Sequence, residues 1–382
     1  MSKSDRERTI FVSIASYRDK TCDKTVQSLL ENAEFPDRIF IGTCEQNDLQ
    51  NINNEQCVSW NDPLLVQRYR QIRRIMISHQ DAEGPCYARY LCSLLYKNED
   101  YFMQIDAHSL LVKHWDSKCI QTHNSLPDPS SKILSYYPNP EDQYAPHPPT
   151  TLHIPVIRSW NMNNDGVIQW DAAQYSELNS PVPSPYIAAG FFFAPGPFVK
   201  KVPYDPQLPY LFMGEELLIT MRAYTSGYDI YTPSTPIIFH RYQRHDEPSV
   251  YVDNASRVNN QQALDRVKRL TGLHFLKNQN PDHIPPTVRE DPYSLGTQRS
   301  CDDYLRLIGF LKDPNTSIPT TKESFAIMTN HAVIRQLQVC KNRMHFLLFV
   351  VAILLTVLIL IAMKSDFFIR LFSSKYKGRP KK

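Results

Sequence analysis

A short stretch of this chain, residues 101–108, joins an apolar run to an acid and a histidine that lie two positions apart. The run Tyr-Phe-Met-Gln-Ile has the composition of a buried strand, and Asp106 ends it. Where a buried strand meets a loop, the side chains of Asp106 and His108 can turn toward one divalent cation. The alternative is an ordinary strand-end turn with a solvated histidine. The stretch therefore predicts a strand of an α/β sheet and a candidate metal site at its end.

The segments around this strand alternate between strand and helix patterns. Residues 9–15 predict a buried strand, residues 23–32 a helix, and residues 38–43 a second strand. Such a strand-helix-strand unit is typical of α/β domains that bind nucleotides. Further helices are predicted near residues 85–96, 115–122, 215–226, 254–271 and 302–310, and further strands at 132–136 and 186–194.

A proline-rich segment interrupts this alternation at residues 138–185. We expect it to be mostly irregular, with a hairpin turn at residues 163–166. A loop of this length inside a compact domain is usually functional, so we expect it to cover a substrate site.

Charged residues mark three further places where strands end or helices begin. Glu215 and Glu216 begin a predicted helix, where acids offset the helix dipole but can also accept hydrogen bonds from sugar hydroxyls. His240 ends an apolar strand and Arg244 follows, so this pair predicts a third metal ligand and a diphosphate clamp, with a basic surface turn as the alternative. Arg89 lies in the first turns of a helix that starts with Gly-Pro, a start that can face an anion or be plain helix initiation.

Composition and missing motifs exclude several functional classes. A net charge of +3 gives the chain no nucleic-acid-binding character, so we expect no nucleic-acid partner. The sequence contains no Walker loop, no dinucleotide fingerprint, no G-x-S-x-G elbow and no H-E-x-x-H motif. Hydrolases of those types, kinases with the standard motifs and dinucleotide dehydrogenases are therefore poorly supported.

The cysteines suggest a reducing environment. They are scattered along the chain without a C-x-x-C pair, which argues against a ribbon-type zinc site and against a disulfide scaffold. We therefore expect free thiols in a reducing compartment.

An apolar stretch near the C-terminus predicts one transmembrane helix at residues 345–363. Apart from one threonine, residues 346–363 are apolar, and at about 1.5 Å per residue they reach roughly 27 Å, enough to cross a bilayer. Residues 1–311 would then form the folded domain, residues 312–344 a linker or stalk, and residues 364–382 a basic tail.

Two signals conflict on the orientation of this helix. No apolar signal-peptide core occurs near the N-terminus, so we expect the folded domain in the cytosol, as in a tail-anchored protein, and the expected free thiols agree. The positive-inside rule points the other way, because more basic residues follow the helix than closely precede it. It would place the domain in the lumen of the Golgi or the endoplasmic reticulum.

Taken together, these pieces resemble a known family. It comprises the GT-A-type polypeptide N-acetylglucosaminyltransferases related to the cytoplasmic hydroxyproline GlcNAc-transferase of protists. The resemblance covers about residues 9–310, and its specificity lies in the combination rather than in any one motif. The matching stretches are residues 10–19, 82–89, 104–108, 115–116, 188–190, 202–206, 211–216, 225–231, 240–244, 295–299 and 303–304.

This resemblance implies a fold and a reaction. The fold would be a GT-A-type nucleotide-diphospho-sugar transferase fold, an α/β architecture with a Rossmann-like mixed sheet flanked by helices. The donor would be UDP-GlcNAc, the cofactor a divalent cation such as Mn²⁺ or Mg²⁺, and the anomeric configuration would be retained. The acceptor would be a protein hydroxyl of hydroxyproline, Ser or Thr.

The resemblance also implies roles for individual residues. Asp106 and His108 would match the D-x-H metal motif, with His240 as the third ligand. Residues on the sugar and acceptor side, here grouped as catalytic, would be Glu215 and Glu216, and those that contact the nucleotide or its phosphates would be Arg18, Asp19, Arg89 and Arg244.

The chain departs from the family in one large respect, its C-terminal membrane helix, because the cytoplasmic relative is soluble and Golgi transferases usually carry an N-terminal anchor. Two alternatives stay open. One is a membrane-tethered binding protein that has lost catalysis on the same fold, and the other is a metal-dependent nucleotide-sugar hydrolase.

Overall fold

The computed structural model describes residues 4–50, 55–149, 152–171, 174–244, 247–273 and 291–311. The chain divides into two units, Met1–Lys322 and Glu323–Lys382. The predicted stalk (312–344), transmembrane helix (345–363) and basic tail (364–382) lie outside the described residues. Among the residues that are described, no helix has both the length and the apolar character needed to span a bilayer.

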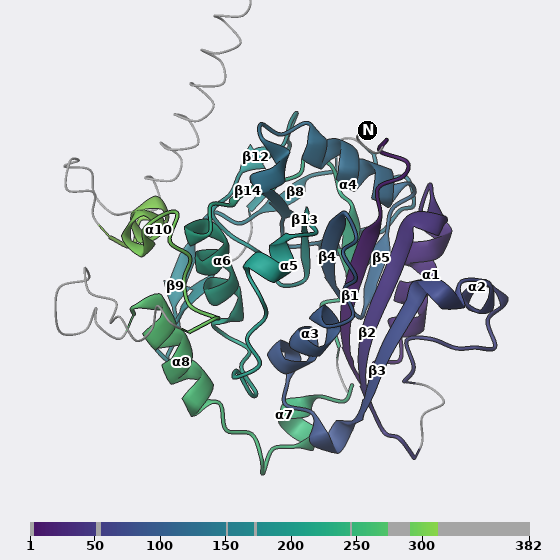
Figure 1. Ribbon diagram of the computed structural model, residues 1–382, viewed down its shortest axis with the longest axis horizontal. Helices are drawn as coiled ribbons and strands as arrows, with labels where there is room; N and C mark the ends of the chain where they lie inside the picture. The colour runs from purple at the N-terminus through teal and green to yellow at the C-terminus, as the bar shows by residue number, and fades with distance from the viewer. Residues whose placement is uncertain are drawn as a thin grey trace, which may run out of the picture. The chain divides into compact units, whose positions relative to one another are not determined.

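The main sheet is mixed, with the strand order β12-β14-β6-β13-β4-β1-β2-β3 (Figure 1). The strands β4, β1, β2 and β3 run parallel, as the strand-helix-strand pattern predicted. β13 is antiparallel to both β4 and β6, which makes the sheet mixed. The strands are β1 Ile10–Tyr17, β2 Ile39–Asn47, β3 Ile72–Ser78, β4 Tyr101–Asp106, β6 Lys132–Ser135, β12 Val182–Pro183, β13 Phe191–Pro195 and β14 Asp229–Thr232.

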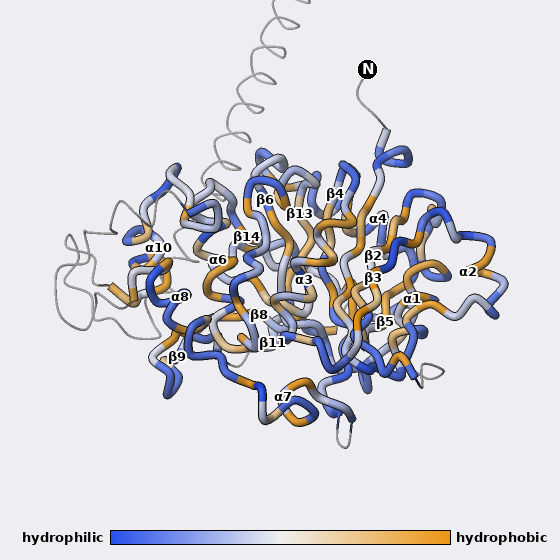
Figure 2. Tube along the Cα trace, turned by 60° about the horizontal axis from the view of Figure 1, so that its bottom comes forward, coloured by the Kyte–Doolittle hydropathy of each residue, from blue (hydrophilic) through white to orange (hydrophobic). Residues whose placement is uncertain are grey.

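Helices cover both faces of this sheet because its central strands are apolar on both sides. Ile10 and Val12 of β1 belong to one core cluster with residues of α1 and α4, whereas Phe11, which packs on Tyr96 and Phe102, belongs to a second cluster with residues of α5 and α6. Figure 2 shows this apolar band running through the central strands. The helices are α1 Cys22–Asn32, α2 Pro63–Gln67, α3 Pro85–Ser93, α4 Trp115–Asn124, α5 Phe198–Lys201, α6 Glu215–Thr225, α7 Val250–Asp253, α8 Gln261–Thr271 and α10 Cys301–Leu307.

Three small sheets complete the described structure, and several of their short strands come from the proline-rich segment. The strands β9 Trp160–Met162 and β10 Ile168–Trp170 form the predicted hairpin, whose turn contains Gly166 at φ 71°. The described part of the segment 138–185 is mostly irregular, as predicted, and its short strands pair with one another and with distant strands. The remaining small strands are β5 Ser109–Leu111, β7 Asn139–Pro140, β8 Ile154–Val156, β11 Gln174–Ser176 and β15 Ile238–His240.

Two pairings bring distant residues to one edge of the main sheet. The parallel register of β1 and β4 sets Ala15 opposite Asp106, so the loops after both strands emerge side by side. The antiparallel pairing of β15 with β5 sets His240 opposite Ser109, directly after His108. The chain therefore collects its strand-end acid and both histidines at one place.

The helix predicted at residues 254–271 is wrong in its first third. Helix α7 ends at Asp253, and α8 starts only at Gln261. Asn254 is the C-cap of α7, with its backbone N–H donating to the Val250 oxygen, and its side-chain amide donates to the backbone oxygen of His79 at 2.9 Å.

The prediction of free thiols is wrong for one pair of cysteines. Cys22 and Cys57 form a disulfide with an S–S distance of 2.04 Å. They lie 35 residues apart in sequence, and the return of the chain after β2 brings them together, so their spacing gave no signal. The other described cysteines, Cys44, Cys86, Cys92, Cys119 and Cys301, are free.

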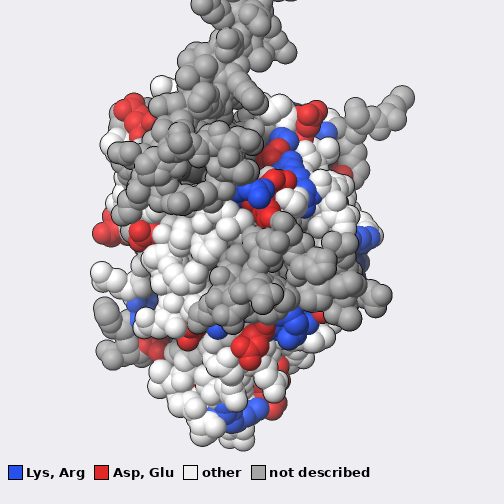
Figure 3. Space-filling model, turned by 90° about the vertical axis from the view of Figure 1, so that its left-hand side faces the viewer, with Lys and Arg blue, Asp and Glu red and all other residues white. Residues whose placement is uncertain are grey.

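Charges of both signs lie on the face that Figure 3 presents. Acidic and basic side chains lie beside one another in its upper right part, whereas acidic side chains stand alone at the upper left rim. This mixture agrees with the small net charge of +3.

Candidate metal centre

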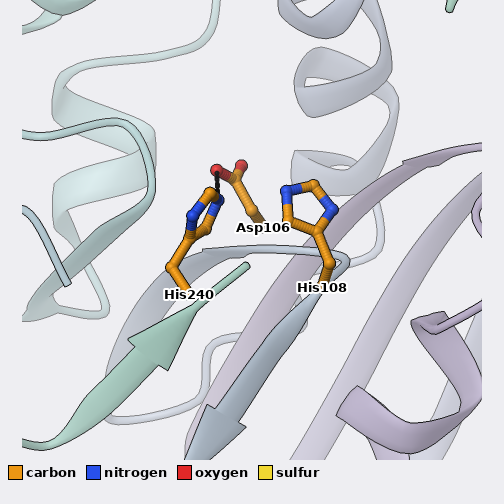
Figure 4. Close-up of side chains that lie close together, drawn as sticks. All are labelled: Asp106, His108 and His240. Atoms are coloured by element: carbon orange, nitrogen blue, oxygen red, sulfur yellow. Dashed lines mark hydrogen bonds and ion pairs between the residues drawn. The ribbon is translucent and has the colours of Figure 1, made fainter. Parts of the chain in front are cut away.

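The structure brings together the three residues predicted as metal ligands. Asp106, His108 and His240 each offer a ligand atom, and these atoms lie within 4.8 Å of one another (Figure 4). Nε2 of His240 lies 3.1 Å from Oδ2 of Asp106, and the two imidazole rings have centroids 4.6 Å apart. A carboxylate and two imidazoles form a donor set that suits a divalent transition metal. The arrangement is a candidate metal centre.

Asp106 is held in its ionised form. Burial would raise the pKa of this carboxyl, but the hydrogen bond from His240 and the charge of Arg89 together hold the pKa well below its usual range. The backbone of Gly190 passes close to this carboxylate. A side chain at position 190 would crowd it, since a Cβ there would lie 3.3 Å from Oδ2 of Asp106. Asp106 is therefore available as an anionic ligand at neutral pH.

Arg89 connects the metal centre to the start of α6. It reaches the site from α3, whose Gly84 N-cap has φ 92° and whose first residue is Pro85, as the Gly-Pro pattern predicted. Its Nη2 donates to Oδ1 of Asp106 at 2.8 Å, and its Nη1 donates to Oε2 of Glu215. The side chain is buried between these two carboxylates, so in this structure Arg89 acts as a bridge between them.

Glu216 lies beside Glu215 at the same helix start and has its own two donors. The Tyr137 hydroxyl donates to Oε2 at 2.8 Å, and the backbone N–H of Ala189 donates to Oε1 at 2.8 Å. Burial raises the pKa of Glu216 to about 7, against the lowering effect of these two hydrogen bonds. The two acids at one helix start thus differ, since Glu215 pairs with an arginine and Glu216 with neutral donors.

Asp19 and Arg244 lie on the other side of the centre, around His108. Oδ2 of Asp19 lies 2.8 Å from Nδ1 of His108 and 3.1 Å from Nη2 of Arg244. The structure therefore places Asp19 and Arg244, two of the four residues predicted to contact the nucleotide or its phosphates, around a candidate metal ligand. A cavity of about 270 Å³ opens beside the same histidine and is lined by Thr21, Lys24, Thr25, His108, Ser109, Leu110, Glu141 and Arg241.

Arg18, which was predicted to contact the nucleotide, pairs with two carboxylates that are not candidate metal ligands. Its backbone adopts φ 45°, and its guanidinium pairs with Glu55 at 3.0 Å and with Asp253 of α7 at 2.8 Å. The Tyr17 hydroxyl donates to the same Asp253 carboxylate at 3.0 Å. Arg18 thus fastens α7 to the end of β1.

Two aromatic residues at the site were not predicted. Tyr137 holds Glu216, and Tyr242 lies against His240 with ring centroids 4.3 Å apart while its hydroxyl donates to the backbone oxygen of Pro138. Each follows a strand by two residues, the same spacing that marks His108 after Asp106. A search for tyrosines within two residues of the end of a predicted strand would have identified both.

Comparison with known proteins agrees with this architecture. The family model described as glycosyltransferase (GlcNAc) matches residues 9–62 and 48–313. GalNAc-T7, crystallised with UDP, GalNAc and Mn²⁺, shares 14% identity over 79% of this chain, with a TM-score of 0.53. This chain spans only 57% of the GalNAc-T7 chain. No curated protein sequence matches the chain.

Two other solved structures are more distant. The 1–349 fragment of S. aureus TarS in complex with UDP-GlcNAc shares 14% identity, covering 72% of this chain and 69% of its own, with a TM-score of 0.41. The mannosyltransferase PcManGT from Pyrobaculum calidifontis, in complex with GDP-Man and Mn²⁺, shares 11% identity. The match covers 86% of this chain and 80% of the PcManGT chain, with a TM-score of 0.38. The mixed sheet matches the GT-A fold, as predicted. Since the family model spans most of the sequence, this chain belongs to the glycosyltransferase (GlcNAc) family.

Proposed function

We propose that this glycosyltransferase moves GlcNAc from UDP-GlcNAc to a hydroxyl of a protein acceptor and retains the anomeric configuration. The observation that carries the proposal is the convergence of Asp106, His108 and His240 at the ends of β4 and β15 in a chain of this family. GalNAc-T7, which shares the fold, was crystallised with UDP, an N-acetylated sugar and Mn²⁺. The choice of GlcNAc as the sugar is supported by the family's name.

The proposed cofactor is a divalent cation, Mn²⁺ or Mg²⁺, held by the one carboxylate and the two imidazoles. When bound, it would offset the negative charge of the departing diphosphate. Of these two ions, Mn²⁺ suits imidazole ligands better, because Mg²⁺ prefers an all-oxygen shell. Asp106 is already ionised at neutral pH and would not have to lose a proton first.

We assign the remaining site residues by their position. Arg244 pairs with Asp19, which itself contacts His108, and would bind the diphosphate, whereas Arg89 would keep Asp106 and Glu215 in place. Glu215 and Glu216 would accept hydrogen bonds from the sugar hydroxyls and so orient the anomeric carbon. The acceptor hydroxyl would attack from the face that UDP leaves, and we assign no side chain as its base.

The acceptor residue, hydroxyproline, Ser or Thr, and the relationship to the protist hydroxyproline enzymes belong to this proposal. So does membrane attachment through residues 345–363, with residues 1–311 as the catalytic domain. The disulfide between Cys22 and Cys57 removes one argument for a cytosolic domain and favours the alternative, the lumen of the Golgi or endoplasmic reticulum.

The test is turnover of UDP-GlcNAc by the full-length protein with Mn²⁺ and peptides that contain hydroxyproline, threonine or serine. UDP release and peptide mass would be followed for the wild type and for the double variant Asp106→Ala, His108→Ala. We expect metal-dependent addition of one GlcNAc, reduced at least 100-fold in the double variant. The matched control, Asp165→Ala with His147→Ala, removes an exposed acid and an exposed histidine and should behave as the wild type.

Three outcomes would contradict the proposal in different ways. Release of free GlcNAc whatever peptide is present would indicate a hydrolase. Transfer of another sugar would overturn the donor assignment. Absence of both turnover and metal-dependent UDP binding would favour a binding protein on this fold.

A further inference from the structure

Asp19 is buried, and each of its carboxylate oxygens has specific partners. The residue is 1% exposed. Oδ1 accepts hydrogen bonds from the backbone N–H and the hydroxyl of Thr21, both at 2.8 Å. Oδ2 faces Nδ1 of His108 at 2.8 Å and Nη2 of Arg244 at 3.1 Å. A carboxylate so enclosed has little capacity left for a nucleotide, which makes direct contact with substrate a poor explanation of its role.

The sheet register explains why Asp19 meets His108. β1 and β4 are parallel neighbours with Ala15 opposite Asp106, so the residues just after both strands share one edge of the sheet. Asp19 turns back toward this edge through its hydrogen bonds with Thr21, immediately before α1. His108 leaves the end of β4 and meets it there.

The contact selects one form of the imidazole. An ionised carboxylate can only accept hydrogen bonds, so Nδ1 of His108 must carry the hydrogen. In the neutral ring, Nε2 then keeps its lone pair, and Figure 4 shows one ring nitrogen of His108 directed toward Asp106. Without Asp19 the ring could place its hydrogen on Nε2 or rotate, and either change would remove a ligand atom.

We propose that Asp19 is a positioning residue of the metal centre, which fixes the tautomer and the orientation of His108 and thereby sets the affinity for the cation. The inference rests on the proposed function only insofar as Asp106, His108 and His240 hold a divalent ion. Through Arg244, Asp19 also anchors the loop that follows His240. One carboxylate thus supports the surroundings of two ligands without touching the ion.

The test measures Mn²⁺ binding directly, by electron paramagnetic resonance of the free ion, in the full-length protein without nucleotide. Asp19→Asn and Asp19→Ala should each weaken Mn²⁺ binding about 10- to 100-fold, the range found when outer partners of metal ligands are removed. The matched control is Asp23→Asn, four residues away, whose carboxylate accepts a hydrogen bond from the backbone N–H of Lys24 and which should bind as the wild type. Turnover of Asp19→Asn should recover at high Mn²⁺ concentration.

A double-mutant cycle separates positioning from general loss of structure. If Asp19 acts through His108, Asp19→Asn should weaken Mn²⁺ binding much less in the His108→Ala background than in the wild type. Equal losses in both backgrounds, or unchanged Mn²⁺ affinity in the single variants, would overturn the inference and leave the proposed function intact. If the wild type itself binds no Mn²⁺, the proposed metal centre fails, and the inference fails with it.

Discussion

Replacing Glu216 with glutamine should make the stability of the domain less sensitive to pH. Burial raises the pKa of this carboxyl from an ordinary value of 4.5 to about 7. The unfolded chain therefore loses this proton near pH 4.5, whereas the folded chain keeps it until about pH 7. Folding is favoured most below pH 4.5, and this contribution is lost as the pH rises through 7. The two pKa values mean that Glu216 contributes about 3 kcal/mol more to the free energy of unfolding below pH 4.5 than well above pH 7.

Glutamine is a suitable replacement because it can keep both hydrogen bonds. Its amide oxygen can accept from the N–H of Ala189, and its amide nitrogen can donate to the Tyr137 oxygen, whose hydroxyl can rotate. The wild type and Glu216→Gln would be unfolded with urea in EDTA at pH values from 4.5 to 8. The stability of the variant relative to the wild type should rise by about 3 kcal/mol over that range. The control, Glu141→Gln at an exposed acid, should follow the wild type at every pH. A difference between Glu216→Gln and the wild type that does not change with pH would refute the reasoning.

Two further predictions concern stability and modification. Asp116 is fully buried, pairs with Arg38 at 2.8 Å and accepts the backbone N–H groups of Glu34 and Phe35, so Asp116→Ala should cost about 3–5 kcal/mol in urea unfolding. Asp37→Ala removes an acid whose side chain is 94% exposed and should cost less than about 1 kcal/mol, so equal losses would contradict the argument. Asn254 begins an Asn-X-Ser triplet but is 7% exposed and donates to His79, so no N-glycan should form there even if the domain folds in the secretory pathway. A glycosidase-sensitive change in electrophoretic mobility that disappears in Asn254→Gln would show otherwise.

Local pattern was enough to predict the elements that carry the site. The strand that ends at Asp106, the helix that starts at Glu215 and the hairpin turn at residues 163–166 each depend on a few neighbouring residues, and the structure has all three. The position of His240 at the end of an apolar strand, followed by Arg244, predicted it as a third ligand, and the resemblance to GT-A enzymes implied the same role. What the pattern could not supply is the antiparallel register that sets β15 beside β5, because that pairing joins segments far apart in sequence.

Partners of charged residues were the hardest part to predict. Arg18, Asp19 and Arg89 were predicted to contact the nucleotide, which stays a prediction; the sequence did not indicate the protein partner, an opposite charge or a histidine, that the structure gives each of them. Which partner a buried charge finds depends on how helices pack, and the sequence holds no periodic signal for that. The disulfide between Cys22 and Cys57 was missed for the same reason, since it follows from a tertiary contact.

The wide separation of the candidate ligands along the chain has a consequence for folding. Asp106 and His240 are 134 residues apart, and they meet only after β15 has paired with β5. Contacts between such distant residues close a large loop and therefore form slowly. A nascent chain that has emerged only as far as α6 already carries Asp106 and His108 but lacks the third ligand. The centre would then be among the last parts of the domain to assemble. Binding of the cation would therefore indicate that β15 has paired with β5.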